Sequence, residues 1–228
     1  MGDLDFSIVS RNMPFLLSGL WFSIKLFAIA LAGGIFFGTL LAMARLSSFK
    51  PLSFMSATFV NLIRSVPFIL AIFWFYFLTP AIVKMITGQQ GEAIGPWTSA
   101  VIAFIVVESA YYSEIIRAGI QSVSRGQPAA AYALGMNYWQ SMAFVVLPQA
   151  FRNMVPIMLT QAIILFQDTS LVYVVGLKDF LGSAAKAGQL AGRLVEMYIF
   201  VAVVFFIICF TASKLVKYIQ TRTTPGAT

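Results

Sequence analysis

Five long apolar runs dominate the pattern of hydrophobic and polar positions along this chain. They cover residues 26–44, 65–83, 93–107, 153–167 and 197–213, and none of them contains a charged residue. A helix that crosses a bilayer needs about 20 predominantly apolar residues. The third and fourth runs are shorter and end at Glu108 and Asp168, so we expect their helices to include a carboxylate. The pattern predicts an all-α integral membrane protein with five transmembrane helices, over residues 18–44, 60–83, 95–117, 148–168 and 196–216, in one domain of residues 1–228.

The composition supports a membrane protein and excludes several kinds of site. Hydrophobic residues make up 60% of the 228 and charged residues only 10%, whereas a soluble domain is about 25% charged. With one cysteine and no histidine, we expect no zinc or iron–sulfur centre and no Ser-His-Asp triad. No GxxxxGK[ST] loop is present, so this chain should not bind ATP phosphates through a P-loop.

The basic residues predict the orientation, because they concentrate on the cytoplasmic side of membrane proteins. With the N-terminus outside, nine of the 15 Lys and Arg residues fall on the inner side and six on the outer side. The acidic residues Asp3, Asp5, Glu92, Asp168, Asp179 and Glu196 then all lie outside or towards it. We therefore expect a periplasmic N-terminus, a cytoplasmic C-terminus and a cytoplasmic loop over residues 120–147. The positive charge points to such loops and not to nucleic acid.

That loop does not have the composition of a membrane span. Pro128 suits the first turn of a helix, the residues after it are strong helix formers, and Gly135 suits the left-handed position that ends a helix. Pro148 marks the entry to the fourth span. We expect two short helices with a turn at Gly135, docked on a partner or, equally, lying in the headgroups through Tyr138 and Trp139.

The same loop resembles a motif of the membrane subunits of binding-protein-dependent ABC importers. Ala130 and Ala131 are followed after three residues by Gly135, and nine residues later by Val145-x-Leu147-Pro148. Three further segments resemble the polar amino acid branch of these permeases, most of all the permease subunits of glutamate/aspartate importers: "NLIRSVPFIL", "ESAYYSEIIRAGIQSVSRGQ" and "FQDTSLVYVVGLKDF". The chain departs from the motif at Ala129, where the family has glutamate, and at Val145, where it has isoleucine.

The resemblance implies a set of partners and a role for the loop. It also implies that ATP and Mg²⁺ bind to the partner ATPase, and that this chain binds no cofactor and carries out no catalysis. The partners are a dimer of ATP-binding subunits, a second permease subunit (identical or different), a periplasmic substrate-binding protein, a polar amino acid and membrane lipid. The location implied is the bacterial inner membrane. The residues expected to couple the loop to the ATP-binding subunit are Ala129, Ala130, Ala131, Gly135, Leu147 and Pro148. We found no internal repeat, which weighs against a secondary transporter of the inverted-repeat type.

Polar residues inside the spans are candidates for a substrate pathway. Glu108 lies near the middle of the third span, where a lone carboxylate costs about 2.5 kcal/mol or more. A cation such as an α-ammonium group, a water-filled cavity or protonation would offset that cost, and Ser109 and Tyr112 are positioned to share its polar face. Gly34 and Gly38 form a small-xxx-small pair that favours close helix packing.

A second group lies nearer the inner side. Glu114 and Arg117, three residues apart, are expected to form an ion pair on one helix face, either structural or as part of a gate. Arg64 precedes Val66-Pro67, where the helix should kink or break. Arg64 then either faces the pathway, where a guanidinium suits a carboxylate, or pairs with Glu108 or Glu114 and closes the pathway at rest.

The end of the fourth span is the last candidate. Asp168, Thr169 and Ser170 either line the substrate cavity, with Gln161 two turns earlier on the same face, or Asp168 caps the next turn. Together these features predict a permease subunit that translocates a polar amino acid, with glutamate or aspartate favoured. The alternatives are a permease for another polar amino acid, a self-sufficient ion-coupled transporter or channel, and a membrane scaffold without transport activity.

Overall fold

The computed structural model describes residues 4–87 and 95–223; Asp3 and Glu92, used in the orientation argument, lie outside these ranges. The described chain is helical throughout, with the following elements in order: α1 (Ser7–Arg11), α2 (Met13–Leu46), α3 (Lys50–Arg64), α4 (Phe68–Thr87), α5 (Pro96–Gln121), α6 (Gly126–Ala133), α7 (Tyr138–Ser141), the π-helical turn η1 (Met142–Val146), α8 (Leu147–Asp168), the 3-10 helix η2 (Thr169–Val175), α9 (Phe180–Ala191) and α10 (Leu194–Thr223).

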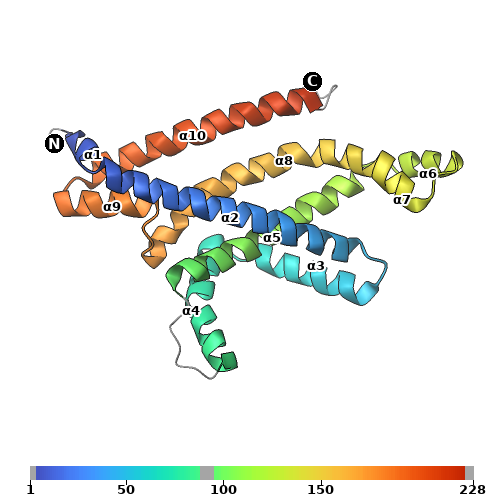
Figure 1. Ribbon diagram of the computed structural model, residues 1–228, viewed down its shortest axis with the longest axis horizontal. Coiled ribbons are helices and arrows are strands. Elements are labelled where there is room, and N and C mark those ends of the chain that lie inside the picture. The colour runs from blue at the N-terminus through green and yellow to red at the C-terminus, as the bar shows by residue number, and fades with distance from the viewer. Residues whose placement is uncertain (1–3, 88–94, 224–228) are drawn as a thin grey trace.

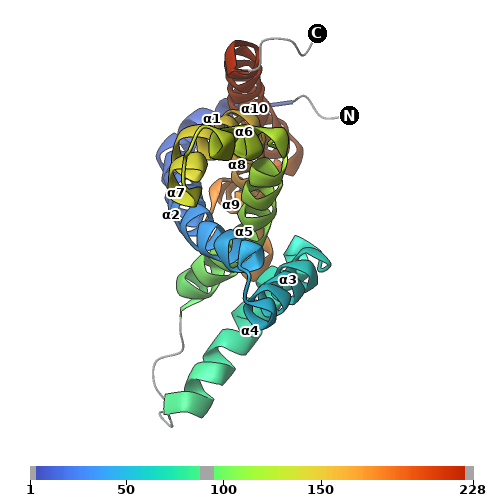
Figure 2. The same ribbon diagram turned by 90° about the vertical axis from the view of Figure 1, so that its right-hand side faces the viewer.

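Five stretches of the described residues are long and apolar enough to cross a membrane, which confirms the predicted fold class. They are α2, α4, α5, the continuous run from Tyr138 to Val175, and α10. These helices run roughly along the long axis of the molecule, except for α4, which leans away from the bundle (Figures 1 and 2). The termini of the membrane helices therefore gather at two opposite ends of the molecule, with α9 at one end and α6 and α7 at the other (Figure 1).

The centre of the bundle is the contact between α2 and α5. A Cβ atom placed on Gly34 would lie 2.7 Å from the Cβ atom of Glu108, and one placed on Gly38 would lie 2.8 Å from the Cβ atom of Tyr112. Real side chains do not approach so closely, so these two positions need glycine. The prediction that Gly34 and Gly38 allow close helix packing is confirmed.

The expected break near Pro67 divides the second predicted span into two helices. α3 ends at Arg64 and α4 begins at Phe68, because a proline nitrogen cannot donate a helical hydrogen bond and its ring disfavours helix before it. The apolar helix that crosses the membrane is thus α4 alone, and Arg64 is placed at the junction. Trp74 and Phe77 of α4 are exposed, as expected of side chains that face lipid.

The end of the molecule opposite α6 and α7 is closed by α9, which the apolar runs did not predict. The carboxylate of Asp179 caps its start by accepting hydrogen bonds from the N–H groups of Leu181 (3.0 Å) and Gly182 (3.1 Å), and Gly192, at φ 64°, ends it. Asp179 is fully buried, and burial raises its pKa to about 7 against the opposing effect of these hydrogen bonds. The helix packs against α2 and α10.

Candidate functional site

Glu108 is buried at the centre of the bundle and bonded to a neighbouring helix. Only 1% of its surface is exposed, and the amide nitrogen of Gln161, on α8, donates to both carboxylate oxygens at 3.3 Å. α2 packs against the same stretch of α5 through Gly34. The carboxylate therefore lies where α2, α5 and α8 meet, and its partner among the described residues is the Gln161 amide.

Tyr112 and Ser109 lie beside this pair but turn towards backbone groups. The Tyr112 hydroxyl donates to the carbonyl oxygen of Met158 on α8 at 3.4 Å, and the Ser109 hydroxyl donates to the carbonyl of Val106 in its own helix at 2.7 Å. Together with Glu108–Gln161, the tyrosine forms a second polar link between α5 and α8. Movement of α8 relative to α5 would have to break both links.

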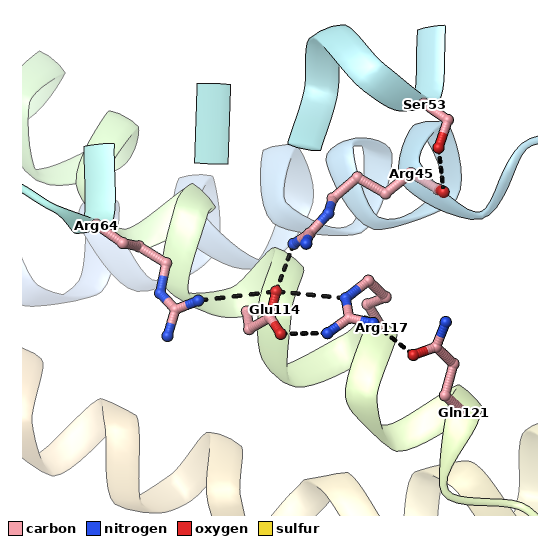
Figure 3. Close-up of polar contacts among 6 residues, drawn as sticks. All are labelled: Arg45, Ser53, Arg64, Glu114, Arg117 and Gln121. Atoms are coloured by element: carbon pink, nitrogen blue, oxygen red, sulfur yellow. Dashed lines mark hydrogen bonds and ion pairs between the residues drawn. The ribbon is translucent and has the colours of Figure 1, made fainter. Parts of the chain in front are cut away.

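The C-terminal half of α5 carries Glu114, a carboxylate surrounded by three guanidinium groups (Figure 3). Glu114 pairs with Arg45 of α2, with Arg117 one turn along α5, and more loosely with Arg64, whose nearest nitrogen lies 3.7 Å away. We call these four residues the arginine cluster. The predicted Glu114–Arg117 pair is present, and of the two partners considered for Arg64 the structure has Glu114.

The members of the arginine cluster differ in how firmly they are held. The Arg45 side chain is 10% exposed, whereas that of Arg64 is 36% exposed and lies over the ring of Tyr111, 5.5 Å from its centroid. Arg117 also bonds to Gln121. The cluster has three cations and one anion, so Arg64 keeps most of its capacity to bind a further carboxylate.

Asp168, Thr169 and Ser170 mark the change from α8 to η2. The hydroxyls of Thr169 and Ser170 donate to carbonyl oxygens three residues earlier, at 2.7 and 2.8 Å, and Thr169 is fully buried. Asp168 is half-buried and, within the described residues, its side chain makes no capping hydrogen bond to η2. The capping alternative is therefore not observed in the described structure. Gln161, two turns before Asp168 on α8, bonds to Glu108.

The predicted pair of short helices is present in the 120–147 loop. α6 ends in a turn in which Gly135, at φ 81°, donates to the Tyr132 carbonyl (3.0 Å) and Met136 donates to the Ala131 carbonyl (3.1 Å). This left-handed closure is the usual end of a helix at glycine. We call α6, the turn and α7 the α6–α7 hairpin. Ala129 and Ala130 are exposed on it, Ala131 is buried, and Leu147 and Pro148 begin α8.

Three features of the structure were not anticipated. Asn137 and Gln140 form a reciprocal capping box, in which each side-chain oxygen accepts the other's backbone N–H at 2.9 Å, and the N-x-x-Q spacing could have indicated it. Arg45 was assigned only to an inner loop, because nothing local in the sequence links it to Glu114, 69 residues away. The Asp179 and Gly192 pair, one on each side of a helix-forming stretch, could have indicated α9.

The fold and these sites define a multi-pass helical membrane protein with polar links between its central helices and a structured hairpin at one end. The family model for inner membrane components of binding-protein-dependent transport systems matches residues 34–225. The chain belongs to this family and is a multi-pass inner membrane protein.

Similar proteins agree with this assignment. The chain is 48% identical over 223 residues to the glutamate/aspartate import permease protein GltK of Escherichia coli O6:H1, covering 98% of this chain and all of the relative. It is 30% identical to the arginine transport system permease protein ArtQ of Bacillus subtilis, over 96% and 97% of the two chains. A solved chain in the crystal structure of an amino acid ABC transporter with histidines superimposes with a TM-score of 0.87 at 31% identity, over 97% and 100% of the two chains.

Proposed function

We propose that this chain is the permease subunit of an ATP-driven, binding-protein-dependent importer that translocates glutamate or aspartate across the inner membrane. The observation that carries the proposal is the 48% identity, end to end, with a glutamate/aspartate import permease. The arginine cluster supports an acidic substrate, because guanidinium groups bind carboxylates with two parallel hydrogen bonds. The relatives at about 30% identity carry other amino acids in their names, so identity at that level does not define the substrate.

The proposed assembly has a second permease subunit beside this chain, two ATP-binding subunits on the cytoplasmic side and a substrate-binding protein on the periplasmic side. The N-terminus is periplasmic and the C-terminus cytoplasmic. The α6–α7 hairpin then meets the ATP-binding subunit through Gly135 and the alanines before it. Hydrolysis of ATP on that partner moves the hairpin, and η1 and α8 carry the movement into the bundle, since they continue directly from it.

Within the bundle, the movement of α8 alternately breaks and re-forms the Glu108–Gln161 and Tyr112–Met158 links. Arg64, at the junction of α3 and α4, binds a substrate carboxylate once the arginine cluster opens, while Glu114 keeps Arg45 and Arg117. Asp168, Thr169 and Ser170 line the other end of the pathway. The chain itself makes and breaks no covalent bond.

Arg64→Ala tests the proposed carboxylate site. A hydrogen bond to a charged group contributes about 1.5–3 kcal/mol, so glutamate uptake by the reconstituted complex should fall roughly 10- to 100-fold. Arg64→Lys keeps the charge but not the planar pair of donors, and we expect an intermediate rate. Arg11→Ala, which removes an exposed cation from α1, is the matched control and should transport normally. Normal uptake by Arg64→Ala would contradict a pathway role for Arg64.

A further inference from the structure

A pocket lies behind the α6–α7 hairpin, between it, the end of α5 and η1. Its volume is about 210 Å³, and its lining includes Arg125, Tyr132, Tyr138, Ser141, Met142 and Val146. The last two belong to η1, the single π-helical turn between α7 and α8 among the described residues. π-helical turns inside α-helical runs are rare and frequently occur at functional sites. The pocket therefore adjoins the point where the hairpin joins the fourth span.

Two polar groups of this pocket, the Ser141 hydroxyl and the Arg125 guanidinium, can each donate a hydrogen bond to an added acceptor. Ser141 is only 1% exposed, and its hydroxyl has no hydrogen-bond partner in the described structure. Arg125 is exposed and forms no ion pair with any residue that the structure describes. Two phenolic hydroxyls and no carboxylate complete the polar lining. A buried hydroxyl without a partner costs about 1–3 kcal/mol, so the pocket is suited to an anionic acceptor.

The charge of the loop points the same way. Arg125 is the single charged residue between positions 120 and 147. Ala129 occupies the position where an acidic residue could have formed an ion pair with a basic residue of a partner. The loop therefore offers a partner one positive charge and no negative charge. A partner that recognises the loop by charge must therefore supply the carboxylate itself.

The surroundings favour a protein as the source of that carboxylate. Leu134, Trp139 and Phe144 are 80%, 77% and 73% exposed around the hairpin, and contiguous exposed apolar side chains mark a contact surface. The hairpin lies beyond the other helices along the long axis of the molecule (Figure 1). Recognition of anionic lipid usually involves clusters of about four to eight basic residues, and this loop has one.

We propose that the pocket receives an Asp or Glu side chain of the ATP-binding subunit, which accepts hydrogen bonds from Arg125 and the Ser141 hydroxyl. The inference rests on the proposed function, because it takes the ATP-binding subunit as the partner of the hairpin. The acid of this contact is on the ATP-binding subunit and the base is on the permease. Its insertion against η1 links the partner directly to the start of α8.

The test is the affinity of the permease complex for its cognate ATP-binding subunit, measured in detergent free of anionic lipid. Close charge pairs across interfaces contribute at least about 1.5 kcal/mol, so Arg125→Glu should weaken binding about 10-fold or more. Arg125→Gln should have a smaller effect. Arg152→Glu, the same charge change at an exposed position on α8 outside the pocket lining, is the matched control and should bind normally.

Ser141→Ala separates docking from folding. Removing an unpartnered buried hydroxyl should leave the thermal stability of the isolated permease unchanged or raise it, while binding of the ATP-binding subunit weakens several-fold. Among Lys substitutions at the acidic surface positions of the ATP-binding subunit, one should restore binding to Arg125→Glu, and that position identifies the inserted residue.

Four results would overturn the inference. The first is that Arg125→Glu binds the ATP-binding subunit normally, and the second is that no substitution on the partner restores binding. The third is that inorganic phosphate or free glutamate binds saturably at Arg125 in the permease alone. The fourth is that the effect of Arg125 substitutions appears only with vesicles that contain anionic lipid. The proposed function has a separate test. If the unmodified permease neither binds the ATP-binding subunit nor stimulates its ATPase activity, both the proposed function and the proposed pocket contact are wrong. If coupling is normal and substitutions of Arg125 have no effect, only the proposed pocket contact is wrong.

Discussion

Glu114→Gln is expected to destabilise the folded chain by roughly 1–3 kcal/mol, less than the range for removing one partner of a fully buried ion pair, because the Glu114 side chain is 24% exposed. Glu114 is the single carboxylate that holds Arg45, Arg64 and Arg117 together (Figure 3). Glutamine keeps the shape but removes the negative charge, and leaves three cations facing one another across α2, α3 and α5. The measurement is unfolding of the purified protein in detergent, followed by helical circular dichroism.

A second substitution makes this result specific to charge. Arg45 is the most buried of the three arginines, so Arg45→Gln added to Glu114→Gln removes the most costly unpaired cation and should recover part of the lost stability. Recovery of this kind is not expected for a cavity or packing defect. If the double variant were as unstable as the sum of the two single variants, the arginine cluster would not be held by Glu114 in the way described.

Gly135→Val is expected to uncouple ATP hydrolysis from transport while the protein still inserts and folds. A Cβ atom at this position meets nothing within 4 Å, so the substitution creates no clash and acts only on the backbone, which has a φ of 81°. The left-handed conformation costs an ordinary residue about 1–2 kcal/mol. The fraction of molecules that keep the hairpin geometry should therefore fall roughly 5- to 30-fold.

The measurement is substrate-stimulated ATPase activity and glutamate uptake in the same proteoliposomes. Gly135→Asn is the matched control, because asparagine adopts the left-handed conformation more readily than other residues with a side chain, and it should retain most of the coupling. Equal loss in both variants would indicate that the side chain obstructs docking. Unchanged stimulation and uptake in Gly135→Val would contradict the coupling role of the hairpin.

Much of the fold could be predicted because apolar runs and helix-ending residues act locally. Each of the five membrane helices follows from one of the uncharged runs, and Gly135 and Pro67 predicted the hairpin turn and the break between α3 and α4. The helix α9 was not predicted, because it is short and rich in alanine and glycine and does not stand out by hydropathy. Its signals were the cap at Asp179 and the left-handed Gly192.

The candidate site was less predictable because its contacts join helices far apart in sequence. Glu108 was correctly recognised as an unusual residue in a span, but its partner, Gln161, is 53 positions away. Helical spacing places Gln161 on the same face of α8 as Asp168, but it does not show that the Gln161 amide reaches Glu108 on α5. Likewise, the spacing of Glu114 and Arg117 predicted their pair, while the contributions of Arg45 and Arg64 depend on how α2 and α3 pack against α5.

The most direct test of the account is uptake of labelled glutamate by proteoliposomes that contain this chain with its partner permease. The account predicts uptake only when the ATP-binding subunits, ATP and the substrate-binding protein are all present, and predicts that glutamate and aspartate compete for it. Accumulation of glutamate by this chain alone, driven by a proton or sodium gradient without ATP, would contradict it.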